Sequence, residues 1–347
     1  MAKVLLIGDT HNGANGNSPR LLQQNVDLYK NFIFPIIKSH NIDFCIDLGD
    51  FFDDREKVDI KVLKTVREQM LADLPVPFYF IVGNHNQYYK NNNVLNNLDG
   101  TIGDLPNVHI VDRFTQVDKI DIFPWITPNN VETYKKCIEL TENPWCCGHF
   151  EFNGFQFDKS RVADVKERMA ASEFRKYIHV FSGHYHIASD NPESHISYVG
   201  SPVQLTWIDC DVEKSVIILD TESGSFRRLV NTNNLYAQYN LPEDGSPLDV
   251  KEEDIRGKRV KIHYNINTDK DKINNLQAIL KSYGPDQLSF VPYGQQKKNA
   301  TTVVDISEGL EKSLHEYLEL MVFNNPKHKS VIEKLLLSYY NKSNKKE

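Results

Sequence analysis

The stretch Val4-Leu5-Leu6-Ile7-Gly8-Asp9-Thr10-His11 passes from four apolar residues directly into a turn that carries a carboxylate and an imidazole. A short apolar run bounded by glycine and polar residues is typical of a buried strand. Four later runs end in the same way: Gly49-Asp50 follows Phe44–Leu48, Gly83-Asn84-His85 follows Phe78–Val82, Gly148-His149 follows Trp145–Cys147, and Gly183-His184-Tyr185-His186 follows His179–Phe181. Open α/β sheets place their sites in loops at the carboxyl ends of strands, so we expect these five turns to converge.

Amphipathic stretches lie between the strands and are predicted to be helices at Leu22–Lys38, Ile60–Leu71 and Val131–Leu140. The alternation of strands and helices predicts an α/β fold. After about Thr221 the pattern changes to a smaller set of elements, with a strand at Gly257–Ile266, a helix at Lys270–Ser282 and a strand at Leu288–Val291. This second set predicts a small α/β module, and a pair of apolar-striped helices is expected beyond it.

The length of 347 residues allows about two domains. Hydrophobic residues make up 40% of the chain and charged residues 25%, which argues against disorder, collagen-like repeats and coiled-coil rods. No run approaches eighteen apolar residues and the first residues lack a cleavage site, so neither membrane insertion nor export is expected. The five cysteines show no C-x-x-C spacing, which favours reduced thiols in a cytoplasmic protein.

The formal net charge of −7 argues against a protein that holds nucleic acid by a bulk positive field. It does not exclude a nuclease. Bound metal cations supply local positive charge to a phosphate, and the carboxylates that hold them add to the negative count.

The polar residues after the strands form a mixed set of carboxylate, amide and imidazole donors without thiolates. The set comprises Asp9, His11, Asp50, Asn84, His85, His149, His184 and His186. One histidine near a strand end is more often a hydrogen-bonded structural residue, but five in equivalent positions indicate a metal centre. Such donors suit Mn²⁺, Fe²⁺, Mg²⁺ or Zn²⁺ at a hydrolytic site rather than a structural zinc held by cysteines.

These turns resemble the motifs of the calcineurin-like metallophosphoesterases, D-x-H, G-D-x-x-D, G-N-H-[DE], G-H and G-H-x-H. Their order and spacing match across residues 4–186, with Asp53 as the last residue of the second motif. The resemblance implies an α/β/β/α sandwich. Within the superfamily the chain is most similar to the SbcD-type DNA double-strand-break repair nucleases, a group that includes nuclease subunits of bacteriophage recombination endonucleases.

Features that point to this branch are the Tyr198-Val199-Gly200-Ser201-Pro202 turn, the small α/β module and the helical hairpin. The domains expected from the resemblance are a nuclease domain at 1–222, a small α/β DNA-binding or capping domain at 223–297, and a C-terminal helical hairpin at 303–347. The resemblance implies that the hairpin docks on an SMC-like ABC-type ATPase. Packing of the hairpin on the catalytic domain is the alternative.

The resemblance also assigns roles by position. One metal would be held by Asp9, His11 and His186, and the other by Asn84, His149 and His184. Asp50 would bridge the two, and His85 would be the catalytic histidine. Asp53 and Asn86 would lie just outside the ligands. Two divalent cations per chain are implied, with Mn²⁺ preferred over Mg²⁺.

Asn86 departs from the family pattern, in which a carboxylate follows Gly-Asn-His. An amide at this position is expected to hydrogen-bond the imidazole of His85 without stabilising its protonated form by charge. The change would be consistent with slower turnover, a shifted pH optimum or an inactive relative.

The preferred function is a metal-dependent DNA endo/exonuclease acting at DNA ends in recombination and repair, as a homodimer with the ATPase and, for a phage protein, in the host cytoplasm. The alternatives are a phosphatase or cyclic-nucleotide phosphodiesterase, and a non-catalytic scaffold on the same fold. Residues that contact DNA are not assigned. Segments 12–20 and 87–91 extend from motif loops, so Arg20, Tyr88, Tyr89 and Lys90 are candidates to contact phosphate or stack on a base, with exposed loop polarity as the alternative. The asparagine-rich run 91–97 is expected to be a flexible loop.

Overall fold

The structure is a computed structural model and describes residues 2–156, 161–244, 246–294, 331–332 and 334–335. The chain forms two compact units, Met1–Tyr293 and Gly294–Glu347. Four residues of the predicted hairpin are described, Val331, Ile332, Lys334 and Leu335, and they are helical. The rest of the hairpin lies outside the described residues. No helix in the described part of the chain is long and apolar enough to cross a bilayer.

The first sheet has six strands in the order β12-β11-β1-β2-β3-β4. Strands β1 to β4 are parallel, β11 pairs antiparallel with β1, and β12 pairs antiparallel with β11. Their bounds are β1 Lys3–Ile7, β2 Phe44–Asp47, β3 Phe78–Ile81, β4 Val108–Val111, β11 Lys214–Asp220 and β12 Phe226–Asn231. Strands β1 and β2 in the middle of the sheet are almost wholly buried, as expected for a sheet covered on both faces.

The second sheet also has six strands, in the order β5-β6-β7-β8-β10-β9. Its central strands β6, β7, β8 and β10 are parallel. The bounds are β5 Thr115–Val117, β6 Ile120–Phe123, β7 Trp145–His149, β8 His179–Gly183, β9 Ser189–Asn191 and β10 Ile196–Tyr198.

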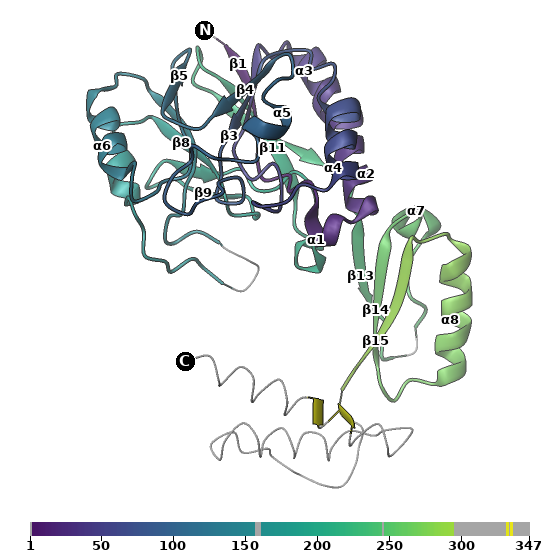
Figure 1. The fold of residues 1–347 in the computed structure, drawn as a ribbon. Helices are drawn as coiled ribbons and strands as arrows, with labels where there is room; N and C mark the ends of the chain where they lie inside the picture. Colours follow the sequence, from purple (N-terminus) through teal and green to yellow (C-terminus); the bar gives the residue numbers. More distant parts are fainter. Residues whose placement is uncertain (1, 157–160, 245, 295–330, 333, 336–347) are drawn as a thin grey trace. The chain divides into compact units, whose positions relative to one another are not determined.

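The apolar core falls into three layers. The middle layer joins inward-facing residues of both sheets, such as Leu6, Ile46, Cys147 and Phe181. A second cluster packs the helices near the N-terminus against the outer face of the first sheet, and a third packs α6 and its neighbours against the second sheet. The predicted α/β/β/α sandwich is therefore confirmed (Figure 1).

The helices of this body are α1 Ala14–Asn17, α2 Pro19–Leu28, α3 Phe34–His40, α4 Ile60–Thr65, α5 Asp99–Ile102 and α6 Val131–Leu140. The single helix expected at 22–38 is α2 and α3 joined by a π-helical turn, η1, at Tyr29–Ile33. Helix α2 begins earlier than expected because Pro19 lies in its first turn, where a missing N–H costs nothing. A second π-helical turn, η2 at Val66–Met70, follows α4, and two 3₁₀ turns are η3 Ala171–Phe174 and η4 Trp207–Asp209.

The small module has a three-stranded parallel sheet in the order β13-β14-β15 with its own apolar core. Its elements are β13 Tyr236–Asn240, α7 Glu252–Ile255, β14 Arg259–Asn265, α8 Lys270–Ser282 and β15 Gln287–Tyr293. Residues 226–231, which the predicted range 223–297 included, form β12 and pair with β11 instead. The polar residues 221–225 form the turn between β11 and β12, in which Asp220 accepts hydrogen bonds from the backbone N–H groups of Glu222 and Ser223.

Candidate metal centre

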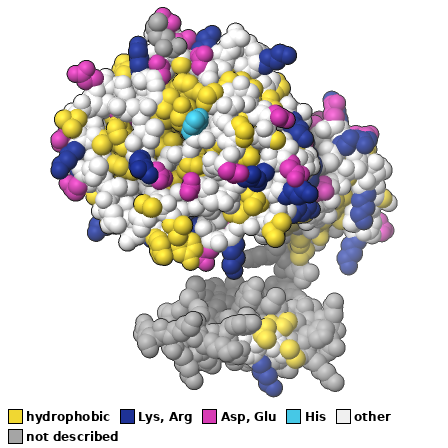
Figure 2. Space-filling model, turned by 45° about the horizontal axis from the view of Figure 1, so that its top comes forward, with side chains coloured by type: hydrophobic (Ala, Val, Ile, Leu, Met, Phe, Trp, Pro, Cys, Tyr) yellow, Lys and Arg dark blue, Asp and Glu magenta, His cyan; other side chains and the backbone are white. Residues whose placement is uncertain are grey.

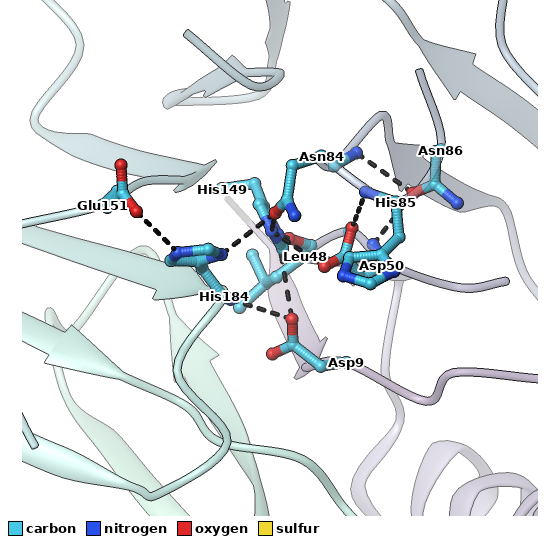
Figure 3. Close-up of polar contacts among 12 residues, drawn as sticks. Asp9, Leu48, Asp50, Asn84, His85, Asn86, His149, Glu151 and His184 are labelled. Carbon is cyan, nitrogen blue, oxygen red and sulfur yellow. Dashed lines mark hydrogen bonds and ion pairs between the residues drawn. The ribbon is translucent and has the colours of Figure 1, made fainter. Parts of the chain in front are cut away.

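The predicted ligands meet where the carboxyl ends of the two sheets come together (Figure 3). The first sheet supplies Asp9, His11, Asp50 and Asn84, and the second supplies His149, His184 and His186. Three of these residues have positive φ, at 45° for His11, 53° for Asp50 and 91° for His184. Non-glycine residues in this region are uncommon and cluster at functional sites. The strands thus end in sharp turns that direct the ligand side chains into one space.

One group of ligand atoms contains Asp9, His11 and His186, all within 4.8 Å of one another. The Nε2 atoms of His11 and His186 lie 3.0 Å apart. Asp9 is fully buried, and its Oδ1 accepts a hydrogen bond from the backbone N–H of His184. Its Oδ2 is buried without a hydrogen-bond partner among the described residues. A buried carboxylate oxygen of this kind needs a cation or a donor.

A second group contains Asp50, His149 and His184. Asn84 completes it, since its Oδ1 lies 3.0 Å from both His149 Nε2 and His184 Nδ1. The Oδ2 of Asp50 lies 3.3 Å from His149 Nε2 and 3.9 Å from His11 Nε2. Asp50 therefore faces both groups, which is the position expected of a bridging ligand.

The far ring nitrogens of three histidines face oxygen acceptors. His149 Nδ1 lies 2.7 Å from the Leu48 carbonyl, and His11 Nδ1 lies 2.9 Å from Asp53 Oδ1. His184 Nε2 lies 3.5 Å from Glu151 Oε1. Each of these oxygens can accept a hydrogen bond from the ring N–H and so directs the other ring nitrogen toward the centre, as is usual for histidine ligands of metals.

The pKa values of the Asp9 carboxyl and the His149 imidazole are shifted in the directions expected where carboxylates lack a neighbouring cation. Burial raises the pKa of the Asp9 carboxyl above its ordinary value. Burial alone would lower the pKa of the His149 imidazole, but the carboxylates of Asp50 and Asp9 outweigh it and raise that pKa to about 9. Protons thus take the place of a cation beside these carboxylates, and metal binding would displace them.

The residues fit a pair of divalent cations. Ring nitrogens and carboxylate or amide oxygens converge in two groups, and one buried oxygen of Asp9 has no other partner among the described residues. Glycines make the convergence possible. A Cβ on Gly83 would collide with the Asp50 carboxylate, and one on Gly49 would collide with the His149 ring.

His85 lies beside the predicted ligands but belongs to neither of the two ligand groups described above, the one containing Asp9 or the one containing Asp50. Its backbone N–H donates to Asp50 Oδ1 at 2.8 Å, and its Nδ1 lies 2.5 Å from the Asp53 carbonyl. This contact with Asp53 leaves Nε2 as the ring nitrogen available to a substrate. His11, Asp53 and His85 also form a third group of potential ligand atoms within 4.8 Å.

The expected hydrogen bond between Asn86 and the imidazole of His85 is not among the contacts that Asn86 makes with the described residues. Its Oδ1 accepts from the backbone N–H groups of Asp50 and Gly83, at 2.9 and 3.0 Å, and its Nδ2 donates to Asn97 Oδ1. The imidazole of His85 bonds to the Asp53 carbonyl instead. Asn86 is fully buried and holds two motif turns together.

The asparagine-rich run is also more ordered than expected. Asn93 donates to the Trp125 carbonyl at 2.9 Å, and Asn97 donates to the carbonyls of Asp54 and His85. Asn93 and Asn96 are buried. The run braces the turn that carries His85 and is not a loose loop.

Sequence reasoning missed two residues at the centre. Glu151 contacts His184, and its only sequence signal is its position two residues after His149. Trp125 packs its ring against His149 and His184, with centroid distances of 5.6 and 5.1 Å. Nothing in the sequence around Trp125 distinguishes it from an ordinary core aromatic residue.

A cavity of about 290 Å³ opens beside the second group of ligands. Its lining includes Asp50, Asn84, His85 and His184, and the guanidinium-bearing Arg161 lies on its wall. A cation beside the metal ligands suits an anionic substrate. Arg20, considered above for phosphate contact, instead lies in α2 and donates to the Gly257 carbonyl at 2.7 Å.

An α/β/β/α sandwich with these donors at the shared edge of its sheets defines the class of the protein as a metallophosphoesterase. Residues 2–188 match the calcineurin-like phosphoesterase family, and the chain belongs to this family. It is 30% identical over 250 residues to exonuclease subunit 1 of Enterobacteria phage T4, covering 70% of this chain and 72% of that protein.

A second relative is the SbcD nuclease subunit of Staphylococcus epidermidis, which is 22% identical over 312 residues and 80% of each chain. A solved archaeal phosphodiesterase is 14% identical with a TM-score of 0.33, covering 66% of this chain and 99% of that one. That score is too low to support an argument about the fold.

Proposed function

We propose that the protein is a metal-dependent DNA nuclease that hydrolyses phosphodiester bonds at DNA ends with two divalent cations. The observation that carries the proposal is the pair of ligand groups that share Asp50. The two relatives, an exonuclease subunit and a nuclease subunit, support DNA as the substrate. On the face shown in Figure 2, acidic and basic side chains are interspersed.

The cations would be held by Asp9, His11 and His186 on one side and by Asn84, His149 and His184 on the other, with Asp50 between them. When bound, they would polarise the phosphodiester and lower the pKa of a water nucleophile. Mn²⁺ is the proposed metal, with Mg²⁺ as the alternative.

The chain's own residues have separate tasks in this proposal. His85 presents Nε2 to the substrate, because its Nδ1 is held by the Asp53 carbonyl, and it stabilises the transition state or protonates the leaving oxygen. Arg161, on the cavity wall, pairs with a phosphate of the strand. Trp125 and the buried carboxyl ends of the strands exclude bulk water from the far side of the ligands.

The assay compares linear DNA with a small chromogenic phosphate ester, using the purified protein and Mn²⁺. DNA cleavage without comparable ester hydrolysis supports the nuclease. The reverse result favours a phosphatase or cyclic-nucleotide phosphodiesterase, and no turnover of either favours a non-catalytic scaffold.

Two variants separate binding from chemistry. His85→Ala should retain metal and lose on the order of 10²–10⁴-fold in rate, whereas His149→Ala with His184→Ala should lose one cation per chain. Retention of two tightly bound cations by the double variant would refute the ligand assignment.

We further propose an SMC-like ATPase partner and a homodimer. The names of the two relatives, each called a subunit, support an assembly with a second kind of subunit. The segment 324–347 carries six lysines and two glutamates, a local charge of +4 in a chain of −7, beside an apolar stripe that includes Leu335 and Leu336. Changing both leucines to Asp should abolish co-purification with the ATPase and leave Mn²⁺-dependent cleavage intact. Loss of folding in that variant would instead assign the stripe to the protein's own core.

A further inference from the structure

A lysine is buried beside the metal centre. Lys214, the first residue of β11, is 1% exposed, and its Nζ contacts three oxygens: Asp209 Oδ1 at 2.6 Å, Ser201 Oγ at 2.8 Å and the His186 carbonyl at 3.0 Å. An ammonium group has three protons to donate, so all are used. Lysine is almost never fully buried unless it is paired, which raises the question of what this one does.

One of the three contacts reaches a metal ligand. His186 lies three residues beyond the end of β8, where strand pairing no longer holds the backbone. Its carbonyl accepts from Lys214 and from the backbone N–H of Ser201 at 3.2 Å. These bonds fix the peptide that carries the His186 ring, whose Nε2 faces His11.

The other end of the network shapes the cavity wall. The second carboxylate oxygen of Asp209 accepts from the backbone N–H groups of Leu205 and Thr206, at 3.0 and 2.9 Å. Thr206, Ile208 and Asp209 line the cavity beside the ligands. The same ammonium group therefore holds a ligand of one proposed cation and the wall of the substrate cavity.

We propose that Lys214 is a positioning residue for His186, an inference that rests on the proposed two-cation centre. A buried ion pair is often no more stabilising than apolar residues of similar size, so stability alone does not explain the lysine. Its three directed hydrogen bonds supply what an apolar residue lacks, a fixed place for the His186 carbonyl and for the turn that ends at Asp209.

The test separates positioning from stability. Lys214→Met leaves the Asp209 carboxylate buried and unpaired and is expected to lower the thermal midpoint. Adding Asp209→Asn removes that charge while the amide oxygen still accepts from Leu205 and Thr206, so the double variant should recover most of the midpoint. Residues that orient metal ligands typically contribute about 10–100-fold in affinity.

Mn²⁺ titration by calorimetry and electron paramagnetic resonance should therefore show one site of the double variant weakened roughly 10–100-fold, with the site of His149 and His184 unchanged. Lys176→Met, at an exposed lysine, is the control for the loss of a lysine that binds backbone carbonyls. Lys176 also donates to two backbone carbonyls, those of Glu139 and Thr141, on the far side of the second sheet, and its loss should leave both affinities intact.

Wild-type affinity at both sites in the double variant would overturn the proposal and leave Lys214 a purely structural residue. If Lys214→Met and its double variant with Asp209→Asn both fail to fold, Ser201→Ala is the alternative. It keeps the ion pair of Lys214 with Asp209 and removes one of the three acceptors of the Lys214 ammonium group. It should weaken the same site by roughly two- to ten-fold, and unchanged affinity would again overturn the proposal. A wild-type protein that binds two cations but cleaves no DNA would refute the nuclease function without affecting this result.

Discussion

Removal of the Glu151 carboxylate is the most direct test of how the ligands are oriented. Glu151 Oε1 lies 3.5 Å from His184 Nε2, and the contact with His184 lowers the pKa of Glu151. The carboxylate is therefore ionised throughout the neutral range and favours the His184 tautomer whose Nδ1 is free for a cation. Glu151→Ala removes this preference, whereas Glu151→Gln keeps an acceptor and loses the charge.

The size of the effect follows from exposure. Carboxylates that orient histidine ligands typically change metal affinity by about 10–100-fold. The Glu151 side chain is 34% exposed, so water screens its charge and replaces part of its hydrogen bonding. We expect a loss of about ten-fold for Glu151→Ala, or about 1.4 kcal/mol, and a smaller loss for Glu151→Gln.

The assay is calorimetric titration with Mn²⁺, which resolves stoichiometry and affinity at each site. Only the site containing His184 should weaken, and excess Mn²⁺ should restore both the occupancy and the cleavage rate. Glu132→Gln is the control, because Glu132 is an acidic residue that pairs on the surface with Lys135. Equal weakening of both sites, or no change in Glu151→Ala, would refute the assigned role.

Three further predictions concern stability. Asn86→Leu leaves the buried N–H groups of Asp50 and Gly83 without an acceptor and should lower the free energy of unfolding by roughly 1–3 kcal/mol for each group. Asn86→Asp keeps an acceptor and should lower it much less, so similar thermal midpoints for the two variants would contradict the prediction. Chelation by EDTA should lower the thermal midpoint, because the cations link ligands from both sheets. The free energy of unfolding should fall by about 2.7 kcal/mol for each cation that was present at 100 times its Kd. An unchanged midpoint in a protein shown to hold metal would exclude this linkage. Burial lowers the pKa of His179 to about 4. The contribution of its neutral imidazole to the free energy of unfolding is therefore complete above about pH 6.5 and is lost as the pH falls toward 4. Its ring is partly exposed, so the loss relative to His179→Gln should be on the order of 1–2 kcal/mol in urea titrations, and parallel pH profiles would contradict it.

The sequence was sufficient to predict the ligand-bearing turns because each follows a short apolar run. Asp9 and Asp50 follow buried strands and His149 is the last residue of one, and parallel strands bring their carboxyl ends to a common edge. The α/β/β/α layering followed from the resemblance, and the motifs that carry it are the same turns.

Other features depend on tertiary contacts that no local pattern encodes. Lys214 begins an apolar strand, and only the approach of Asp209, Ser201 and the His186 carbonyl explains a charge there. The placement of β12 in the first sheet, and not in the predicted small domain, has a similar cause. Residues 221–225 are polar and turn-forming in either case, and only pairing with β11 distinguishes a hairpin from a linker.

The pairing of β1 with β11 has a consequence for how the chain is made. Strand β1 forms at residues 3–7, yet its antiparallel neighbour lies at 214–220, so one edge of β1 stays open while more than two hundred residues are synthesised. At ribosomal rates of 5–20 residues per second, this interval is roughly 10–40 s. Open strand edges are templates for aggregation. A nascent chain stalled between His186 and Lys214 is therefore expected to contain every ligand-bearing turn and still depend on chaperones to remain in solution.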